Sequence, residues 1–129
     1  MSVNVGGIVM IKIDSREDSQ LSKHLIDICK REKIEYEKVW LEIGDYVIGD
    51  CCIEAKSSAD FLASVRNNRI FNQLDNMDRT YNKNIILIYG DLDYAVSYLH
   101  RTQYNTMSWR NKLKKIFIGA LTSIALHTD

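Results

Sequence analysis

The chain lacks several features that assign a sequence to common protein classes. It contains no proline, which is unusual but indicates no function. No apolar run approaches the roughly 18–20 residues that a membrane-spanning helix needs, and the N-terminus shows no secretory signal. No internal repeat, low-complexity tract or linker interrupts the sequence. We therefore expect one globular domain over residues 1–129, with a hydrophobic core and no membrane partner.

Cysteine and histidine are also scarce. The three cysteines (Cys29, Cys51 and Cys52) are odd in number, two of them are adjacent, and their spacing suits no metal site. A disulfide framework is therefore not expected. A reducing, intracellular setting fits best, either the cytoplasm of a prokaryote or archaeon or the nucleus of a eukaryote. The three histidines share no spacing with the acidic residues, so we assign them no chemistry.

What the sequence does have is a set of charged residues suited to phosphodiester hydrolysis. Asp45 is followed nine residues later by Glu54, and Lys56 stands two residues beyond Glu54. Carboxylates bind hard divalent cations, and Mg²⁺ is typically held by only one or two of them together with substrate phosphate. A lysine beside such a metal can position the attacking water and offset developing negative charge. The three residues therefore predict a metal-assisted nuclease site.

The surrounding residues strengthen this interpretation. Residues 51–53 approach Glu54 as an apolar strand, and side chains alternate along a strand, so Glu54 and Lys56 would point to the same face. Buried strands seldom carry a carboxylate and an ammonium without a reason. The structural alternatives are that Asp45 is a turn residue and that Glu54 and Lys56 form a solvated strand face.

Hydrophobic periodicity predicts an α/β protein. Strands are expected at residues 8–13, 34–41, 46–48, 51–56 and 84–89, the last being the most clearly buried. Helices are expected at 19–33, after Ser57, around 70–77, near 94–101 and from 108 onward. Gly49-Asp50 is a good two-residue hairpin turn. Asp60 has a rival role as the last residue of a helix capping box that begins at Ser57. This alternation of strands and helices indicates a central mixed β-sheet flanked by helices.

Together with further motifs, these residues resemble the nuclease domain of the XPF/Hef family of structure-specific endonucleases. The motifs occur in the family's order: Asp14, Arg16 and Glu17; then Gly44-Asp45-Tyr46; then Glu54-Ala55-Lys56 followed by Asp60; then Arg69 through Gln73. The resemblance extends from about residue 8 to residue 125. It implies a restriction-endonuclease-like core and a metal-dependent DNA-repair endonuclease. The expected substrate is branched DNA, such as flaps and forks, cut near the single-strand/double-strand boundary.

The resemblance also implies a role for each residue of these motifs. Asp45 and Glu54 would bind Mg²⁺ or Mn²⁺, and Lys56 would position the water. The remaining residues would support that site: Asp14 and Glu17 as additional metal ligands or supports of the metal, Asp60 as a catalytic residue that orients Lys56, and Arg16, Arg69 and Gln73 as DNA-binding or site-supporting residues.

Two departures from the family pattern bear on the interpretation. Ala55 stands where the family has arginine, and residues 1–129 contain no counterpart of the family's helix-hairpin-helix domain. The resemblance implies dimerisation through the nuclease domain, as a homodimer or a heterodimer, and the broad apolar stripe of the C-terminal helix is a candidate surface. Two alternatives stay open: a catalytically silent DNA-binding or scaffolding subunit, and a nuclease of the same fold that acts on Holliday junctions or single strands.

Overall fold

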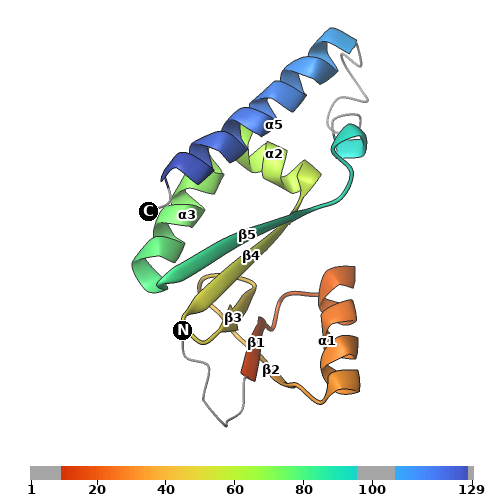
Figure 1. Ribbon diagram of the computed structural model, residues 1–129, viewed down its shortest axis with the longest axis vertical. Coiled ribbons are helices and arrows are strands. Elements are labelled where there is room, and N and C mark those ends of the chain that lie inside the picture. Colours follow the sequence, from red (N-terminus) through yellow and green to blue (C-terminus); the bar gives the residue numbers. More distant parts are fainter. Residues whose placement is uncertain (1–9, 96–106, 128–129) are drawn as a thin grey trace. The chain divides into compact units, whose positions relative to one another are not determined.

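The computed structural model describes residues 10–95 and 107–127 (Figure 1). The strands are β1 (Met10–Asp14), β2 (Glu35–Val39), β3 (Tyr46–Ile48), β4 (Cys51–Ser57) and β5 (Lys83–Tyr89). The helices with assigned bounds are α1 (Gln20–Glu32), α2 (Ser58–Arg66), α3 (Arg69–Thr80) and α5 (Met107–His127). The helix predicted near 94–101 lies largely outside the described residues. None of the described helices combines the length and apolarity that crossing a membrane requires.

The five strands form one mixed sheet in the order β2-β1-β3-β4-β5. β1 and β2 are parallel, whereas β1 pairs antiparallel with β3, and β3 with β4. The predicted mixed sheet with flanking helices is therefore confirmed. The chain divides into two compact units: residues up to 55 together with 74–87, called here the first unit, and 56–73 together with those from 88 on, called the second unit. The expectation of a single domain stays a prediction.

One face of the first unit's sheet packs against α1. The buried residues of this cluster are Ile11, Ile13, Cys29 and Tyr46, and Leu21, Leu25 and Ile26 of α1 pack against them. The helix begins where Ser19 Oγ accepts the Ser22 N–H at 3.1 Å, and it ends at Lys33 in the left-handed conformation. The predicted amphipathic helix at 19–33 is thus confirmed, and its apolar side covers β1 and β3.

The other face of the β3–β4 hairpin is buried as well. Val47 and Cys52, which alternate with the residues facing α1, pack with Leu41 and with Met77 from α3. The hairpin turns at Gly49 as predicted, with a positive φ of 60°. The cysteines form no disulfide, and burial raises the pKa of the Cys52 thiol to about 12. Packing on both faces fixes this hairpin, which carries the acids predicted for the site.

The second unit has its own apolar core around α2 and α5. Phe61 of α2 and Phe117 of α5 meet edge to face with ring centroids 5.2 Å apart. Ser57 is the N-cap of α2, and its Oγ accepts the Asp60 N–H at 3.1 Å, so the predicted cap is confirmed. Ser58 Oγ ties the start of α2 to the end of β5 by donating to the carbonyl of Tyr89.

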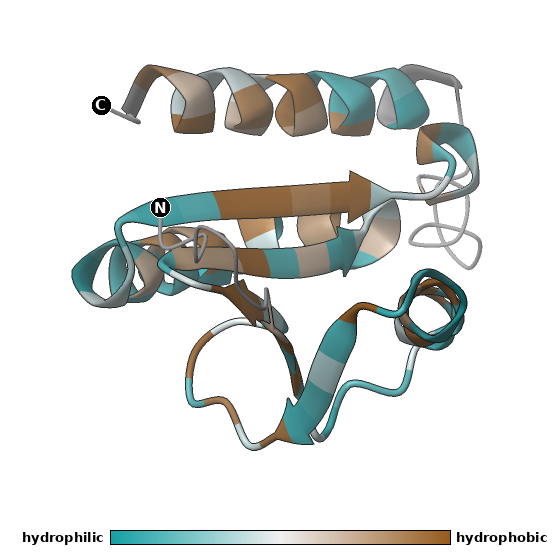
Figure 2. Cartoon of the chain, turned by 60° about the horizontal axis from the view of Figure 1, so that its bottom comes forward, coloured by the Kyte–Doolittle hydropathy of each residue, from teal (hydrophilic) through white to brown (hydrophobic). Residues whose placement is uncertain are grey.

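The prediction that residues 84–89 form the most clearly buried strand is wrong in one respect. The strand is present as β5, and Figure 2 shows most of it coloured as hydrophobic, but Ile85, Leu87 and Tyr89 are 40–48% exposed. The exposed residues alternate with the partly buried Asn84, Ile86 and Ile88, so one face of β5 is less covered than the other by the described residues. A continuous apolar run predicts a strand that is buried on both faces. Among the described residues, every second side chain of β5 stays exposed.

Gly44 offers a direct test of how tightly this core is built. Its φ is +89°, and a Cβ added there would collide with Sγ of the buried Cys52. We expect Gly44→Ala to lower the free energy of unfolding by about 1–2 kcal/mol from the backbone conformation alone, measured by urea titration. The matched control is Gly119→Ala on α5, where an added Cβ meets no atom within 4 Å. That variant should raise stability by up to about 1 kcal/mol. Equal urea midpoints for Gly44→Ala and wild type would contradict the packing described.

Candidate active site

Backbone hydrogen bonds bring the segments that carry the predicted acids to one place in the first unit. The Asp14 N–H at the end of β1 donates to the Asp45 carbonyl at 2.8 Å. The Asp45 N–H in turn donates to the Ile53 carbonyl at 3.0 Å, next to Glu54 on β4. Residues far apart in the sequence therefore meet just before β3.

The β3–β4 hairpin brings Asp45 and Glu54 together. The paired register ends at Tyr46 and Ile53, and the two residues just beyond it, Asp45 and Glu54, lie close enough for their side chains to interact. The Ala55 N–H also donates to Asp45 Oδ2 at 2.9 Å, which orients this carboxylate. The side chains of Asp45 and Glu54 are half-buried. The hairpin therefore brings together the two residues that the sequence predicts as metal ligands.

Negative charge accumulates at this position. Burial raises the pKa of the Asp45 carboxyl, and the neighbouring Glu17 carboxylate raises it further. The Ala55 N–H and the Glu54 side chain lower the pKa of Asp45 but do not cancel that rise. A divalent cation would relieve this crowding of carboxylates. Crowded, half-buried oxygen donors are what a hard cation requires.

The arrangement fits Mg²⁺ or Mn²⁺ better than a closed structural metal cage. Within residues 10–95 and 107–127, no three His, Cys, Asp or Glu side chains are grouped as a metal-binding set. Structural zinc sites need four such ligands. Mg²⁺ keeps several waters and uses one or two carboxylates, with substrate phosphate completing its shell. Asp45 and Glu54 therefore fit a site of the magnesium type.

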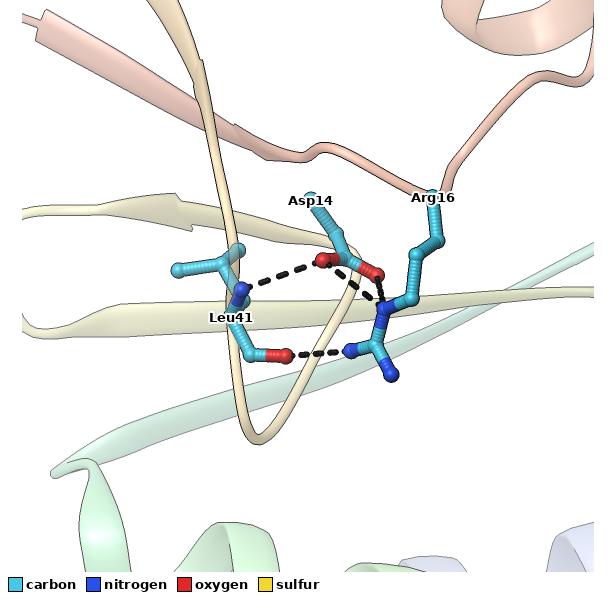
Figure 3. Close-up of polar contacts among 3 residues, drawn as sticks. All are labelled: Asp14, Arg16 and Leu41. Atoms are coloured by element: carbon cyan, nitrogen blue, oxygen red, sulfur yellow. Dashed lines mark hydrogen bonds and ion pairs between the residues drawn. The ribbon is translucent and has the colours of Figure 1, made fainter.

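Asp14 has a different set of partners, shown in Figure 3. Its Oδ1 accepts the Leu41 N–H at 3.0 Å, and Nε of Arg16 donates to its two oxygens at 3.3 and 3.1 Å. Nη2 of Arg16 donates to the Leu41 carbonyl. Burial of the Asp14 carboxyl raises its pKa, but the Leu41 N–H and the Arg16 guanidinium outweigh burial, so the pKa lies below its usual value. Asp14 therefore holds the segment after β2 in place, and its role toward a metal stays a prediction.

A further residue of this corner was not predicted from the sequence. Trp40 is 63% exposed, and the Arg16 guanidinium lies 5.0 Å from the centroid of its ring. The sequence contains one indication of its exposure. In an extended segment Trp40 points to the opposite side from its neighbours Val39 and Leu41, which are apolar and face inward. Its partner Arg16, 24 residues earlier, has no such signal in the sequence.

On β4 the predicted alternation holds. Glu54 and Lys56 are two residues apart on the strand and both half-buried. Ala55 between them packs against the apolar cluster that contains Ile11 and Ile13. Ala55, which stands where the family has arginine, therefore faces the opposite side of β4 from Glu54 and Lys56.

The remaining predicted residues lie in the second unit. Asp60 donates its N–H to the cap of α2 while its side chain is exposed, and Arg69 at the start of α3 is exposed too. Gln73, one turn further along α3, is half-buried, and its Oε1 has no hydrogen-bond partner among the described residues. Their roles in catalysis and DNA binding stay predictions.

Comparison with known proteins identifies the relatives of this chain. The sequence model of the ERCC4 domain matches residues 13–129. The chain is 34% identical over 82 residues to the DNA repair endonuclease XPF of Mus musculus. The aligned region covers 63% of this chain and 9% of that protein. It is 35% identical over 83 residues to the DNA repair protein RAD1 of Saccharomyces cerevisiae, covering 64% and 7% respectively.

The fold also matches a solved structure. The structure of XPF from Aeropyrum pernix in complex with DNA superposes with a TM-score of 0.67 at 20% identity, covering 92% of this chain and 52% of that chain. At this identity the match establishes the fold alone. The chain spans less than a tenth of the length of the curated relatives named above and about half of the solved chain.

The contacts of Asp14 predict a defined dependence of stability on pH. Because its folded-state pKa is lowered, its contribution is complete above the unfolded pKa of about 4 and is lost as the pH falls through the folded value. At neutral pH, Asp14→Asn should lower the free energy of unfolding by about 1–3 kcal/mol, because the neutral amide loses the ion pair with Arg16 and weakens the charge-assisted bond from the Leu41 N–H. The difference from wild type should shrink below about pH 4.

Urea titrations at several pH values measure this difference. The matched control is Asp27→Asn, which neutralises an exposed carboxylate on α1 and should have little effect. A loss of stability in Asp14→Asn that is the same at pH 3 and pH 7 would show that the ionised carboxylate is not what stabilises this corner.

Proposed function

The chain belongs to the ERCC4 domain family, and we propose on that basis that it is the nuclease domain of a metal-dependent DNA endonuclease. It would cut branched DNA, such as flaps and forks, near the junction of single and double strands, in the intracellular compartment that holds DNA. The observation that carries the proposal is the approach of the Asp45 carboxylate to β4, where it accepts the Ala55 N–H and meets the Glu54 side chain, with Lys56 two residues further along the strand.

Each residue of the site takes a definite part in this proposal. Asp45 and Glu54 would hold Mg²⁺ or Mn²⁺, and a cation there would supply a lowered pKa of water and neutralisation of phosphate charge. Lys56 positions the attacking water and stabilises negative charge as it develops on the phosphate. Glu17 adds a carboxylate beside Asp45, and Asp14 keeps the Asp45 segment in place through its backbone N–H.

The proposed reaction is hydrolysis of a phosphodiester bond. A water oxygen forms a new bond to phosphorus, the bond to the bridging oxygen breaks, and the leaving oxygen takes up a proton. Asp60 would orient Lys56. Arg69 and Gln73 would hold the scissile backbone.

Two observations favour an active nuclease over a catalytically silent subunit. The chain retains the acid pair and Lys56. Ala55, which replaces the family's arginine, packs against an apolar cluster on the opposite side of β4. Its lack of a cation therefore leaves the face that carries Glu54 and Lys56 unchanged.

The proposal predicts which variants lose activity. Wild type should cut end-labelled forked and flapped duplexes near the branch with Mn²⁺ or Mg²⁺. Asp45→Asn and Lys56→Ala should each reduce the rate by about 100-fold or more, because each removes charge from the reacting centre. Four-way junctions and single strands, tested in parallel, separate the alternative substrates.

Matched controls keep the charge change but move it away from the site. Asp27→Asn and Lys30→Ala alter exposed residues of α1 and should cut like wild type. Cutting that persists in Asp45→Asn and Lys56→Ala would place the activity elsewhere. A wild-type chain that binds forked DNA without cutting it would instead support the silent subunit.

We also propose that a second copy of the chain, or a related chain, packs on α5. Leu113, Phe117 and Ala120 are buried, as the predicted stripe requires, but the helix has further apolar residues that remain exposed. Ile118 and Leu126 are 59% and 80% exposed. Apolar residues on a second side of one helix support a protein partner there.

Sedimentation analysis tests this surface. Ile118→Lys should shift the chain toward monomer at concentrations where wild type is dimeric, because it places a charge in the proposed interface. The control Asn111→Lys adds the same charge at an exposed polar position of α5 and should leave the dimer intact. A wild-type chain that stays monomeric throughout, or an unaffected Ile118→Lys dimer, would exclude this surface.

A further inference from the structure

Trp40 is placed where a large aromatic ring gains little from its own fold. It follows β2 directly and is 63% exposed. Tryptophan is highly buried on average and contributes strongly to a core when it is covered. A tryptophan kept at the surface at a fixed position is therefore a candidate for contact with a ligand.

The backbone on both sides of Trp40 is fixed. On one side the Val39 carbonyl accepts the Ser15 N–H at 2.8 Å. On the other side Leu41 donates its N–H to Asp14 and accepts a hydrogen bond at its carbonyl from Arg16. Both neighbours of Trp40 are thus tied to the residues at the end of β1. A ring held in this way loses little conformational freedom when a ligand covers it.

Arg16 covers part of the Trp40 ring. Its guanidinium lies 5.0 Å from the ring centroid, and its own position is set by bonds to Asp14 and to the Leu41 carbonyl. A cation over an indole ring is a favourable arrangement. Because the ring remains mostly exposed, it still offers a flat aromatic surface to a ligand.

The position of this pair identifies the kind of ligand. The Asp14 N–H donates to the Asp45 carbonyl, so the residue that anchors Arg16 also anchors the candidate metal ligand. Glu42, two residues after Trp40, is exposed, and Glu17 directly follows Arg16 in the sequence. Negative charges near the ring repel phosphate, so the phosphate backbone is not the group that the ring would bind. An aromatic surface beside a nuclease centre suits the face of a nucleobase.

We propose that Trp40, backed by Arg16, is a stacking platform for an unpaired base of the DNA substrate. The inference rests on the proposed nuclease function and deepens it, because it assigns the single-stranded arm of the branch to this corner. In a continuous duplex each base face is covered by its neighbours, so the platform distinguishes an unpaired base from a paired one. Stacking of this kind tolerates any base sequence.

Equilibrium binding of the full chain, without divalent cation, tests the platform. Fluorescence anisotropy compares a labelled fork with single-stranded arms and a blunt duplex of equal length. Trp40→Ala should weaken binding of the fork by about 5–150-fold, the range for loss of one stacked base, and leave the blunt duplex unchanged. Trp40→Phe should recover most of the affinity. The matched control Tyr94→Ala removes another aromatic side chain, 68% exposed, in the second unit and should bind both DNAs like wild type.

A second measurement observes the ring directly. The chain has two tryptophans, so Trp109→Phe leaves Trp40 as the only one. Titration with a single strand should quench its fluorescence, as stacking requires, and an equal concentration of blunt duplex should not. Unquenched Trp40 emission in the presence of bound single strand would overturn the platform.

The outcomes separate this inference from the proposed function. Equal weakening of fork and duplex binding in Trp40→Ala, no weakening at all, or failure of Trp40→Phe to recover affinity would each overturn the platform. If wild type cuts at branches while Trp40→Ala keeps full fork affinity, the nuclease stands and the platform falls. If wild type cuts nothing but fork affinity depends on Trp40, the platform stands and the nuclease falls.

Discussion

The interaction on which the site depends is the one between the buried Asp14 carboxylate and the Leu41 N–H, supported by Arg16. It joins the end of β1 to the segment that follows β2. Through its own N–H, Asp14 also holds the carbonyl of Asp45. Asp14 therefore positions both Asp45, which precedes β3, and the exposed Trp40. The carboxylate must be ionised and paired to stay buried, and its lowered pKa reflects this.

The β3–β4 hairpin supplies the second constraint. Because it is packed on both faces, its register cannot slip without moving core side chains to the wrong side. The hairpin holds Asp45 close to β4, where burial and the neighbouring Glu17 carboxylate together raise the pKa of the Asp45 carboxyl. The apolar core therefore stabilises an arrangement of acids that is unfavourable by itself. A bound cation would relieve the repulsion between these carboxylates, and this relief would contribute to the affinity for the metal.

The sequence predicted the local features well because each depends on nearby residues. The hairpin at Gly49, the cap at Ser57 and the face of α1 follow from spacing and short-range hydrogen bonds. The exposure of β5 was missed because it depends on which neighbours cover each face of the strand. The partners of Asp14 were missed for a similar reason, since Leu41 contributes through its backbone, which no sequence pattern reveals.

The central claim is that Asp45 and Glu54 form a divalent-cation site, and calorimetric titration of the chain with Mn²⁺ tests it most directly. Wild type should show a binding isotherm that disappears in Asp45→Asn, while the control Asp27→Asn binds like wild type. Binding of Mn²⁺ with unchanged affinity and stoichiometry in Asp45→Asn would contradict the claim.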